Sequence, residues 1–151
     1  MMDNVKAIQM LNEKLVGNSY TYISIGDYWS LFIDHELWLV SHEVSTSEED
    51  GINNILSGIT PPVLDGVDSE DIAKAIAVIR HKRQPTSGIS LAADGTLELI
   101  FDNNRRLAFS SAVDIVDWQW CLNSSGDDPY HDRDFLVACF WTGEVKIKEE
   151  R

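Results

Sequence analysis

The sequence predicts an α+β fold, in which about two helices pack on a mostly antiparallel sheet of seven to nine strands. Three observations support this class. Short apolar or alternating runs recur along the chain, separated by turn-forming residues. Two longer segments carry apolar residues at helical spacing instead. With 151 residues, of which 44% are hydrophobic, a single domain can bury roughly 68–70% of its unfolded surface. We therefore expect residues 1–151 to form one domain.

The first helix is expected over residues 3–16. Its apolar side chains, from Val5 to Leu15, recur at intervals of three and four residues. Gly17 and Asn18 follow, and this pair is typical of a helix end.

Strand-like patterns fill residues 19–44. The expected strands are residues 20–25, 29–33 and 37–42. Gly26 and Asp27 predict the turn between the first two strands. Asp34 and His35 predict a tight hairpin between the second and the third, although neither is the glycine that such a turn prefers.

Residues 45–68 are mostly polar or turn-forming, which predicts a long surface connection. Four apolar residues within it allow a short helix: Ile52, Ile55, Leu56 and Ile59. The next helix is expected over residues 72–83. The mostly acidic run 68–71 precedes it and meets the positive end of the helix dipole, and Pro85 ends it.

The second half of the chain predicts six more strands and one polar loop. The expected strands are residues 89–92, 96–101, 106–109, 114–122, 135–141 and 144–148. Asp94 and Gly95 form a strong hairpin signal. Trp118 and Trp120 are two positions apart and are expected on the same side of one strand. Residues 123–134 predict a polar loop.

Negative charge is concentrated in the first half of the chain. Between Lys14 and Lys74 there is no lysine or arginine, but there are eleven carboxylates. Residues 1–72 carry a net charge of −11 and residues 73–151 carry −2. A surface of one sign attracts partners of the other sign, so we expect a basic protein partner and neither nucleic acid nor an anionic membrane. The alternative is that this charge serves solubility alone.

Two acidic segments supply the candidate contacts to such a partner. The candidates are Asp34, Glu36, Glu43, Glu48, Glu49, Asp50, Asp127, Asp128, Tyr130, Asp132 and Asp134. A few desolvated anchors supply most of the affinity of an interface, and aromatic residues are enriched among them. Trp38 and Tyr130 lie beside acids in the sequence and are therefore candidate anchors.

Catalytic motifs are absent from the sequence. It has no phosphate-binding glycine loop, no dinucleotide-binding glycine pattern and no G-x-S-x-G nucleophile motif. His35 and His42 are each followed by glutamate, but the second histidine of the zinc motif H-E-x-x-H is missing. We expect both to be ordinary solvent-facing strand histidines. We also expect no catalytic residue and no cofactor.

Residues 127–134 hold the best candidate metal ligands. The ligands would be Asp127, Asp128, His131, Asp132 and Asp134. The spacing of a calcium-binding EF-hand is absent. Aspartates in turns commonly accept hydrogen bonds from their own backbone, and Pro129 favours a bend. An Asx-rich turn is therefore the preferred interpretation, and a metal-dependent hydrolase is the least favoured function.

The cysteines and the N-terminus indicate a compartment. Cys121 and Cys139 are too few for a disulfide framework and are expected to be buried free thiols in a reducing environment. The N-terminus lacks the basic and apolar regions of a signal peptide, and no run approaches 18 apolar residues. We expect a soluble cytoplasmic protein.

Two blocks of the sequence resemble a known class of proteins. The first is DYWSLFI at 27–33 with WLV at 38–40. The second is DIVDWQW at 114–120, followed by the loop at 126–129 and by ACFW at 138–141. Together they resemble small bacterial immunity proteins of polymorphic toxin and contact-dependent growth inhibition systems. This resemblance implies a cytoplasmic antidote that forms a heterodimer with a toxin domain and has no catalytic residues.

Charge and resemblance thus lead to the same hypothesis. A nuclease needs a basic groove to hold phosphates, and a carboxylate-rich protein can occupy that groove and exclude the substrate. The favoured function is therefore inhibition of a basic toxin domain, with a nuclease as the expected toxin. The alternative is an acidic adaptor without a toxin partner.

Overall fold

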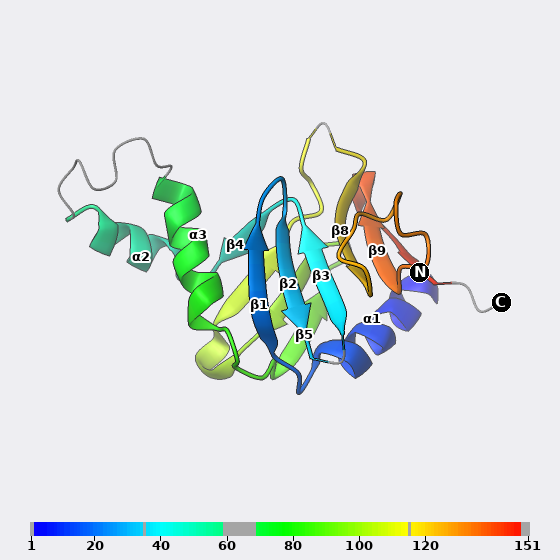
Figure 1. Ribbon diagram of the computed structural model, residues 1–151. Helices are drawn as coiled ribbons and strands as arrows, with labels where there is room; N and C mark the ends of the chain where they lie inside the picture. Colours follow the sequence, from blue (N-terminus) through cyan, green and yellow to red (C-terminus); the bar gives the residue numbers. More distant parts are fainter. Residues whose placement is uncertain (1, 35, 59–68, 115, 149–151) are drawn as a thin grey trace.

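The computed structural model describes residues 2–34, 36–58, 69–114 and 116–148 and confirms the α+β class. These residues form three helices and ten strands (Figure 1). The helices are α1 (Met2–Leu15), α2 (Glu49–Leu56) and α3 (Ser69–Arg80). The strands are β1 (Tyr20–Ile25), β2 (Trp29–Ile33), β3 (Leu37–Ser41), β4 (Val44–Thr46), β5 (Gly88–Leu91), β6 (Leu97–Ile100), β7 (Arg106–Phe109), β8 (Trp118–Asn123), β9 (Val137–Phe140) and β10 (Glu144–Ile147). Two 3-10 turns lie at Asp102–Asn104 and Trp141–Gly143.

The strands form two antiparallel sheets, where the sequence predicted one. The six-stranded sheet has the order β1-β2-β3-β8-β9-β10, and the four-stranded sheet has the order β4-β7-β6-β5. The strand count slightly exceeds the seven to nine expected, because the segment predicted as a loop from residue 45 contributes β4. Only His42 and Glu43 separate β3 from β4, and there the chain passes from one sheet to the other. Alternation of side chains reveals which face of a strand is buried but not which sheet it joins.

One hydrophobic core fills the space between the sheets. Inward-facing side chains of the six-stranded sheet, such as Leu31 and Leu39, pack with Leu99 and Phe109 of the other sheet. The helices close the sides of this core. Ala7, Leu11 and Leu15 of α1 are buried in it, and α1 contacts the edge strands β5 and β10. Ala77 and Val78 of α3 join the core, and α3 contacts β4 (Figure 1).

A close backbone contact connects two turns, one from each sheet. Gly143 has φ +80°, and a Cβ atom there would lie 1.9 Å from the carbonyl oxygen of Asp94. The hairpin that contains Asp94 also accepts a hydrogen bond of 2.8 Å at the Gly95 carbonyl, from the indole N–H of Trp120. The predicted Asp94–Gly95 turn is therefore fixed to the six-stranded sheet.

The two tryptophans of β8 face opposite sides of the sheet, so the prediction that they share a face is wrong. Trp118 pairs with Phe140 while Trp120 pairs with Cys139, which leaves Gln119 as an extra residue. This β-bulge reverses the alternation between the two tryptophans. Trp120 lies in the core between the sheets, and Trp118 belongs to an outer cluster.

The buried side chain of Gln119 also explains why β8 begins at residue 118 and not at 114. Its amide oxygen accepts a hydrogen bond of 2.7 Å from the Val113 N–H. Its amide nitrogen donates to the carbonyl oxygens of Val113 and Val116. These bonds hold Val113 and Val116 outside the sheet, where alternation predicted more strand; residue 115 lies outside the described residues.

The helices begin and end close to the expected positions. α3 stops three residues early, because Arg83 has φ 69° and its N–H donates to the carbonyl oxygen of Tyr20. The short helix allowed within 45–68 exists as α2. His35 and the predicted loop residues 59–68 lie outside the described residues. No helix in the described ranges is long and apolar enough to cross a membrane.

Candidate partner-binding surface

Glu48, a predicted partner contact, is instead bound by cations of its own chain. Its carboxylate pairs with Arg80, lies 3.1 Å from Nε2 of His81 and lies 3.8 Å from Nε of Arg105. The Glu48 side chain is only 17% exposed. The His81 ring is fully buried and stacks on Phe101. Glu48 therefore connects the chain before α2 to the end of α3.

Two further predicted contacts also have partners within the chain. Glu43 forms an ion pair of 3.0 Å with Lys74 of α3. Asp34 accepts hydrogen bonds from the backbone N–H and the hydroxyl of Ser19, at 3.2 and 3.3 Å. Glu36 is exposed, with φ 66° in the turn after β2. Glu36 thus adopts the left-handed backbone conformation that glycine adopts in most such turns.

Glu49 and Asp50 lie in the first turn of α2. Acidic residues at this position favour the helix through its dipole. Figure 1 shows α2 beyond the β1 edge of the sheet, on the side of the molecule away from β9 and β10. Glu49 and Asp50 therefore lie on another part of the surface from the acidic residues that precede β9.

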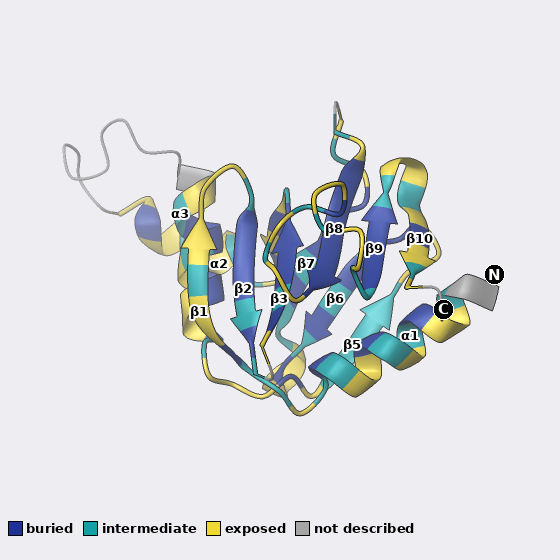
Figure 2. Cartoon of the chain, turned by 45° about the vertical axis from the view of Figure 1, so that its right-hand side comes forward, coloured by how far each residue is buried: buried dark blue, intermediate teal, exposed yellow. Residues whose placement is uncertain are grey.

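The remaining candidates lie in the loop over residues 124–134, which crosses the outer face of the six-stranded sheet near β8 and β9 (Figures 1 and 2). The carboxylate of Asp128 accepts hydrogen bonds from the N–H groups of Tyr130 and His131. Asp132 accepts from the Ser125 hydroxyl at 2.6 Å and from the Asp134 N–H at 3.0 Å. The bonds from backbone N–H groups to Asp128 and Asp132 are the Asx turns that the sequence predicted for this segment.

The pair of Asp128 and His131 has matched pKa shifts. The ring nitrogen Nδ1 of His131 lies 2.7 Å from Oδ2 of Asp128, and this bond together with the nearby negative charge raises the pKa of His131. Partial burial acts to raise the pKa of Asp128, but the hydrogen bonds from His131 and Tyr130 outweigh it and lower that pKa. The contact therefore favours the charged form of both side chains.

Aromatic rings cover much of this outer face. Tyr28 packs edge-on against Trp118, with the ring centres 5.2 Å apart, and His42 lies 4.0 Å from Trp118. The sequence predicted a solvent-facing strand residue at His42, and this prediction is wrong. His42 is instead part of a cluster of aromatic rings. Burial lowers its pKa, although Asp128 and Glu43 partly oppose this.

Gly126 packs the loop against the indole ring of Trp38. This glycine has φ +82°, and a Cβ atom there would lie 3.2 Å from the indole ring. The Tyr28 hydroxyl donates a hydrogen bond of 3.4 Å to the Gly126 carbonyl. On the other side of the loop, Tyr130 is 53% exposed and Trp141 is 45% exposed. Both can serve as anchors for a partner.

Two hollows flank the loop and differ in charge. The first, of about 410 Å³, is called the serine groove here; it is lined by Tyr22, Ser24, Gly26, Asp27, Tyr28, Ser30, Trp38, Ser125 and Gly126. The second, of about 490 Å³, is lined by Asp117, Pro129, Tyr130, Arg133, Phe135, Phe140, Trp141 and Lys146. The serine groove contains a carboxylate and no basic residue, whereas the second hollow contains both signs.

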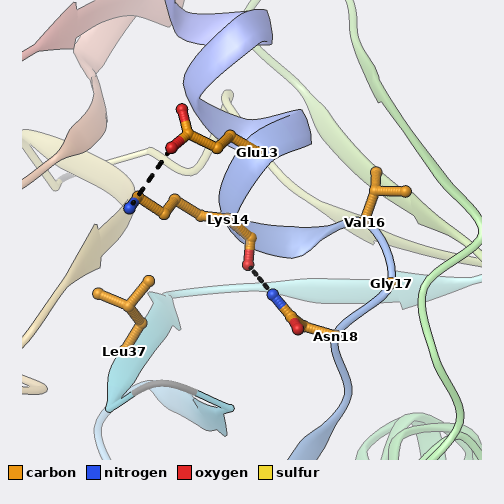
Figure 3. A pocket seen from close by; sticks show the side chains of 6 residues that line it. All are labelled: Glu13, Lys14, Val16, Gly17, Asn18 and Leu37. Carbon is orange, nitrogen blue, oxygen red and sulfur yellow. Dashed lines mark hydrogen bonds and ion pairs between the residues drawn. The ribbon is translucent and has the colours of Figure 1, made fainter.

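A third hollow, of about 380 Å³, lies where α1 ends beside the start of β3 (Figure 3). Its two charged side chains, Glu13 and Lys14, approach each other to 3.8 Å. The amide of Asn18 donates a hydrogen bond of 2.7 Å to the Lys14 carbonyl. These contacts explain the end of the helix and suggest no ligand.

Three carboxylates lie close enough to Tyr28 to influence its ionisation. Burial raises the pKa of Tyr28, and the charges of Asp127, Asp128 and Asp27 raise it further. Asp27 was not among the predicted contacts. The sequence gives only a weak signal for the serine groove. Ser24 and Ser30 stand among aromatic residues in adjacent predicted strands.

The arrangement offers binding groups but no metal site within the described residues. There, no group of three His, Cys, Asp or Glu side chains is placed to hold one ion. Cys121 belongs to the outer cluster and Cys139 to the main core. Burial raises the pKa of both thiols to about 12, so neither is a thiolate at neutral pH.

Comparison with protein-family models, with curated protein sequences and with solved structures gave no match.

Proposed function

We propose that this chain is an immunity protein that binds a basic toxin domain in the cytoplasm and neutralises it, with a nuclease as the expected toxin. One observation supports this proposal most strongly. Asp27, Asp127 and Asp128 are gathered beside exposed aromatic rings on the outer face of the six-stranded sheet. Such a surface combines charge that attracts a basic protein with rings that can anchor it.

Each component has a distinct physical role in the proposed inhibition. With a net charge of −13, the protein attracts a basic domain from a distance, and opposite fields can raise association rates to about 10⁸–10⁹ M⁻¹s⁻¹ at low salt. Affinity then comes from a few desolvated anchors, for which Trp141 and Tyr130 are suited. Rapid capture protects the cell because one toxin molecule turns over many substrates.

The proposal is tested with the toxin domain expected at the end of the secreted protein encoded immediately upstream of this chain. The toxin's activity on RNA and DNA is measured while this chain is added in increasing amounts. We expect complete inhibition near one molar equivalent, and growth of cells that express both proteins. Binding without inhibition would instead support the adaptor alternative, and the absence of binding would contradict the proposal.

A further inference from the structure

The serine groove has a small, polar floor between aromatic walls. Ser24 and Ser30 are direct partners in the β1–β2 register, and their short side chains leave space above the sheet. In the next row, Tyr22 of β1 and Trp38 of β3 stand on either side of Phe32, which pairs with both. The volume of about 410 Å³ lies within the range of roughly 300–1,000 Å³ that is usual for small-ligand sites.

Two loops complete the lining of the groove. Gly26, Asp27 and Tyr28 come from the β1–β2 connection, and Ser125 and Gly126 come from the loop over residues 124–134. The Tyr28 hydroxyl bonds to the Gly126 carbonyl, so the two loops are connected. The parts of the lining that come from these two loops are therefore held together.

The aromatic wall is suited to a flat cation. Tyr22 and Trp38 meet edge to face, with ring centres 5.9 Å apart and planes at 86°, and Tyr22 is 57% exposed. Trp38 is held by Phe32, 4.8 Å away, and by Gly126. Cations bind over the faces of such rings, and an arginine guanidinium does so most often.

The charge of the groove also favours a cation. None of the nine lining residues is basic, and Asp27 lies in the wall. Asp127 and Asp128 directly follow the lining residue Gly126 in the chain, and their charges raise the pKa of Tyr28, another lining residue. The second hollow offers no such preference, because Arg133 and Lys146 are among its lining residues.

We propose that the serine groove binds the side chain of one arginine of the basic partner protein. The guanidinium would stack on the exposed ring of Tyr22, which Trp38 supports from the side, and its planar set of five N–H donors would bond Asp27 and the serine hydroxyls. Lysine offers a compact charge without a stacking plane and is the weaker ligand. This inference rests on the proposed function for the identity of the partner, but the groove can be tested without that partner.

The test uses N-acetyl-arginine amide as the ligand and follows ¹⁵N-labelled protein by NMR. N-acetyl-lysine amide and the uncharged isostere N-acetyl-citrulline amide are the comparisons. We expect a saturable shift of the Trp38 indole N–H and of the Gly26 and Ser125 amides, with a Kd on the order of 1–10 mM. Lysine amide should bind several-fold more weakly, and citrulline amide should give no saturation.

Two variants locate the binding site. Tyr22→Ser removes a half-exposed ring, and Asp27→Asn removes the charge at almost constant shape; each should weaken arginine binding at least fivefold. Asp50→Asn, on α2, is the matched control and should leave it unchanged. The spectrum of each variant shows whether it is folded. Arginine binding that fails to saturate, equals that of citrulline, or survives both groove variants would overturn the inference.

The outcome is separable from the proposed function. If the protein inhibits the toxin domain but its groove does not bind arginine amide, the groove inference fails and the proposed function stands. If arginine amide saturates the groove but the toxin domain is not inhibited, the groove inference stands and the proposed function fails.

Discussion

Gly143 is the residue whose substitution the backbone tolerates least. A Cβ atom there would lie 1.9 Å from the Asp94 carbonyl, at a φ of +80°. We predict that Gly143→Ala lowers the free energy of unfolding by about 2–5 kcal/mol, through clash and strain together. Urea unfolding followed by tryptophan fluorescence measures this loss.

Gly51→Ala is the matched control for that measurement. Nothing lies within 4 Å of a Cβ atom at Gly51, which is an exposed residue of α2. Alanine there should leave stability unchanged or raise it by up to about 1 kcal/mol. A Gly143→Ala protein as stable as the wild type would contradict the close contact between the two turns.

The pKa values of His131 and His42 are predicted to lie on opposite sides of 6.5, the ordinary pKa of histidine. The pKa of His131 is raised, so its pairing with Asp128 stabilises the fold below 6.5 and is lost as the pH rises through the raised pKa. The pKa of His42 is lowered, so its environment favours the neutral ring and stability falls as the pH drops below 6.5. An NMR titration of the imidazole resonances measures both values.

Asp128→Asn provides the control for the histidine titration. It removes the charge beside His131, so the pKa of His131 should return towards 6.5. The pKa of His42 should then fall further, because Asp128 opposes its lowering. If His131 in the unmodified protein titrates at or below 6.5, the hydrogen bond to Asp128 does not exist in solution.

At this scale, some features of single residues follow from the sequence and others depend on tertiary contacts. That Cys121 and Cys139 would be buried and free could be predicted from their number and from the typical burial of cysteine. The opposite orientations of Trp118 and Trp120 could not be predicted, because the bulge at Gln119 depends on pairing with β9. The pairing of Glu48 depends on Arg80 and Arg105, far along the chain.

At the scale of elements, Glu48 connects the chain before α2 to α3 and is predicted to be structural. Glu48→Ala would leave the buried Nε2 of His81 without its carboxylate partner. We expect a loss of about 1–3 kcal/mol in the free energy of unfolding. Thermal and urea unfolding both measure it.

Glu13→Ala is the comparison for Glu48→Ala, because the Glu13 side chain is 71% exposed and only approaches Lys14. We expect its effect to stay within about 0.5 kcal/mol. If Glu48→Ala is as mild as Glu13→Ala, the carboxylate does not hold α3, and Glu48 becomes available again as a partner contact.

Elements with a strong local signal could be predicted from the sequence. The helical spacing from Val5 to Leu15 gave α1, and Asp94 with Gly95 gave the β5–β6 hairpin. β4 could not be predicted, because its three residues look like loop and become a strand only by pairing with β7. The division into two sheets follows from such long-range pairings.

At the scale of the whole molecule, folding partly reverses the separation of charge seen along the chain. Lys74, Arg80 and Arg105 belong to the nearly neutral second half, yet they pair with Glu43 and Glu48 of the acidic first half. Carboxylates of both halves, Asp27 with Asp127 and Asp128, gather around Tyr28 instead. The net charge could be predicted from composition, but the location of the acidic surface required the tertiary contacts.

The most direct test of the account is the association rate of this chain with its toxin domain, measured by stopped flow at increasing salt. We predict that the rate falls about tenfold or more between low and high salt, because opposite fields accelerate the encounter. The double variant Asp27→Lys with Asp127→Lys should slow association at low salt far more than Glu49→Lys with Asp50→Lys, which changes the net charge equally on α2. Equal slowing by the two double variants, or a rate independent of salt, would contradict an acidic docking surface on the outer face of the six-stranded sheet.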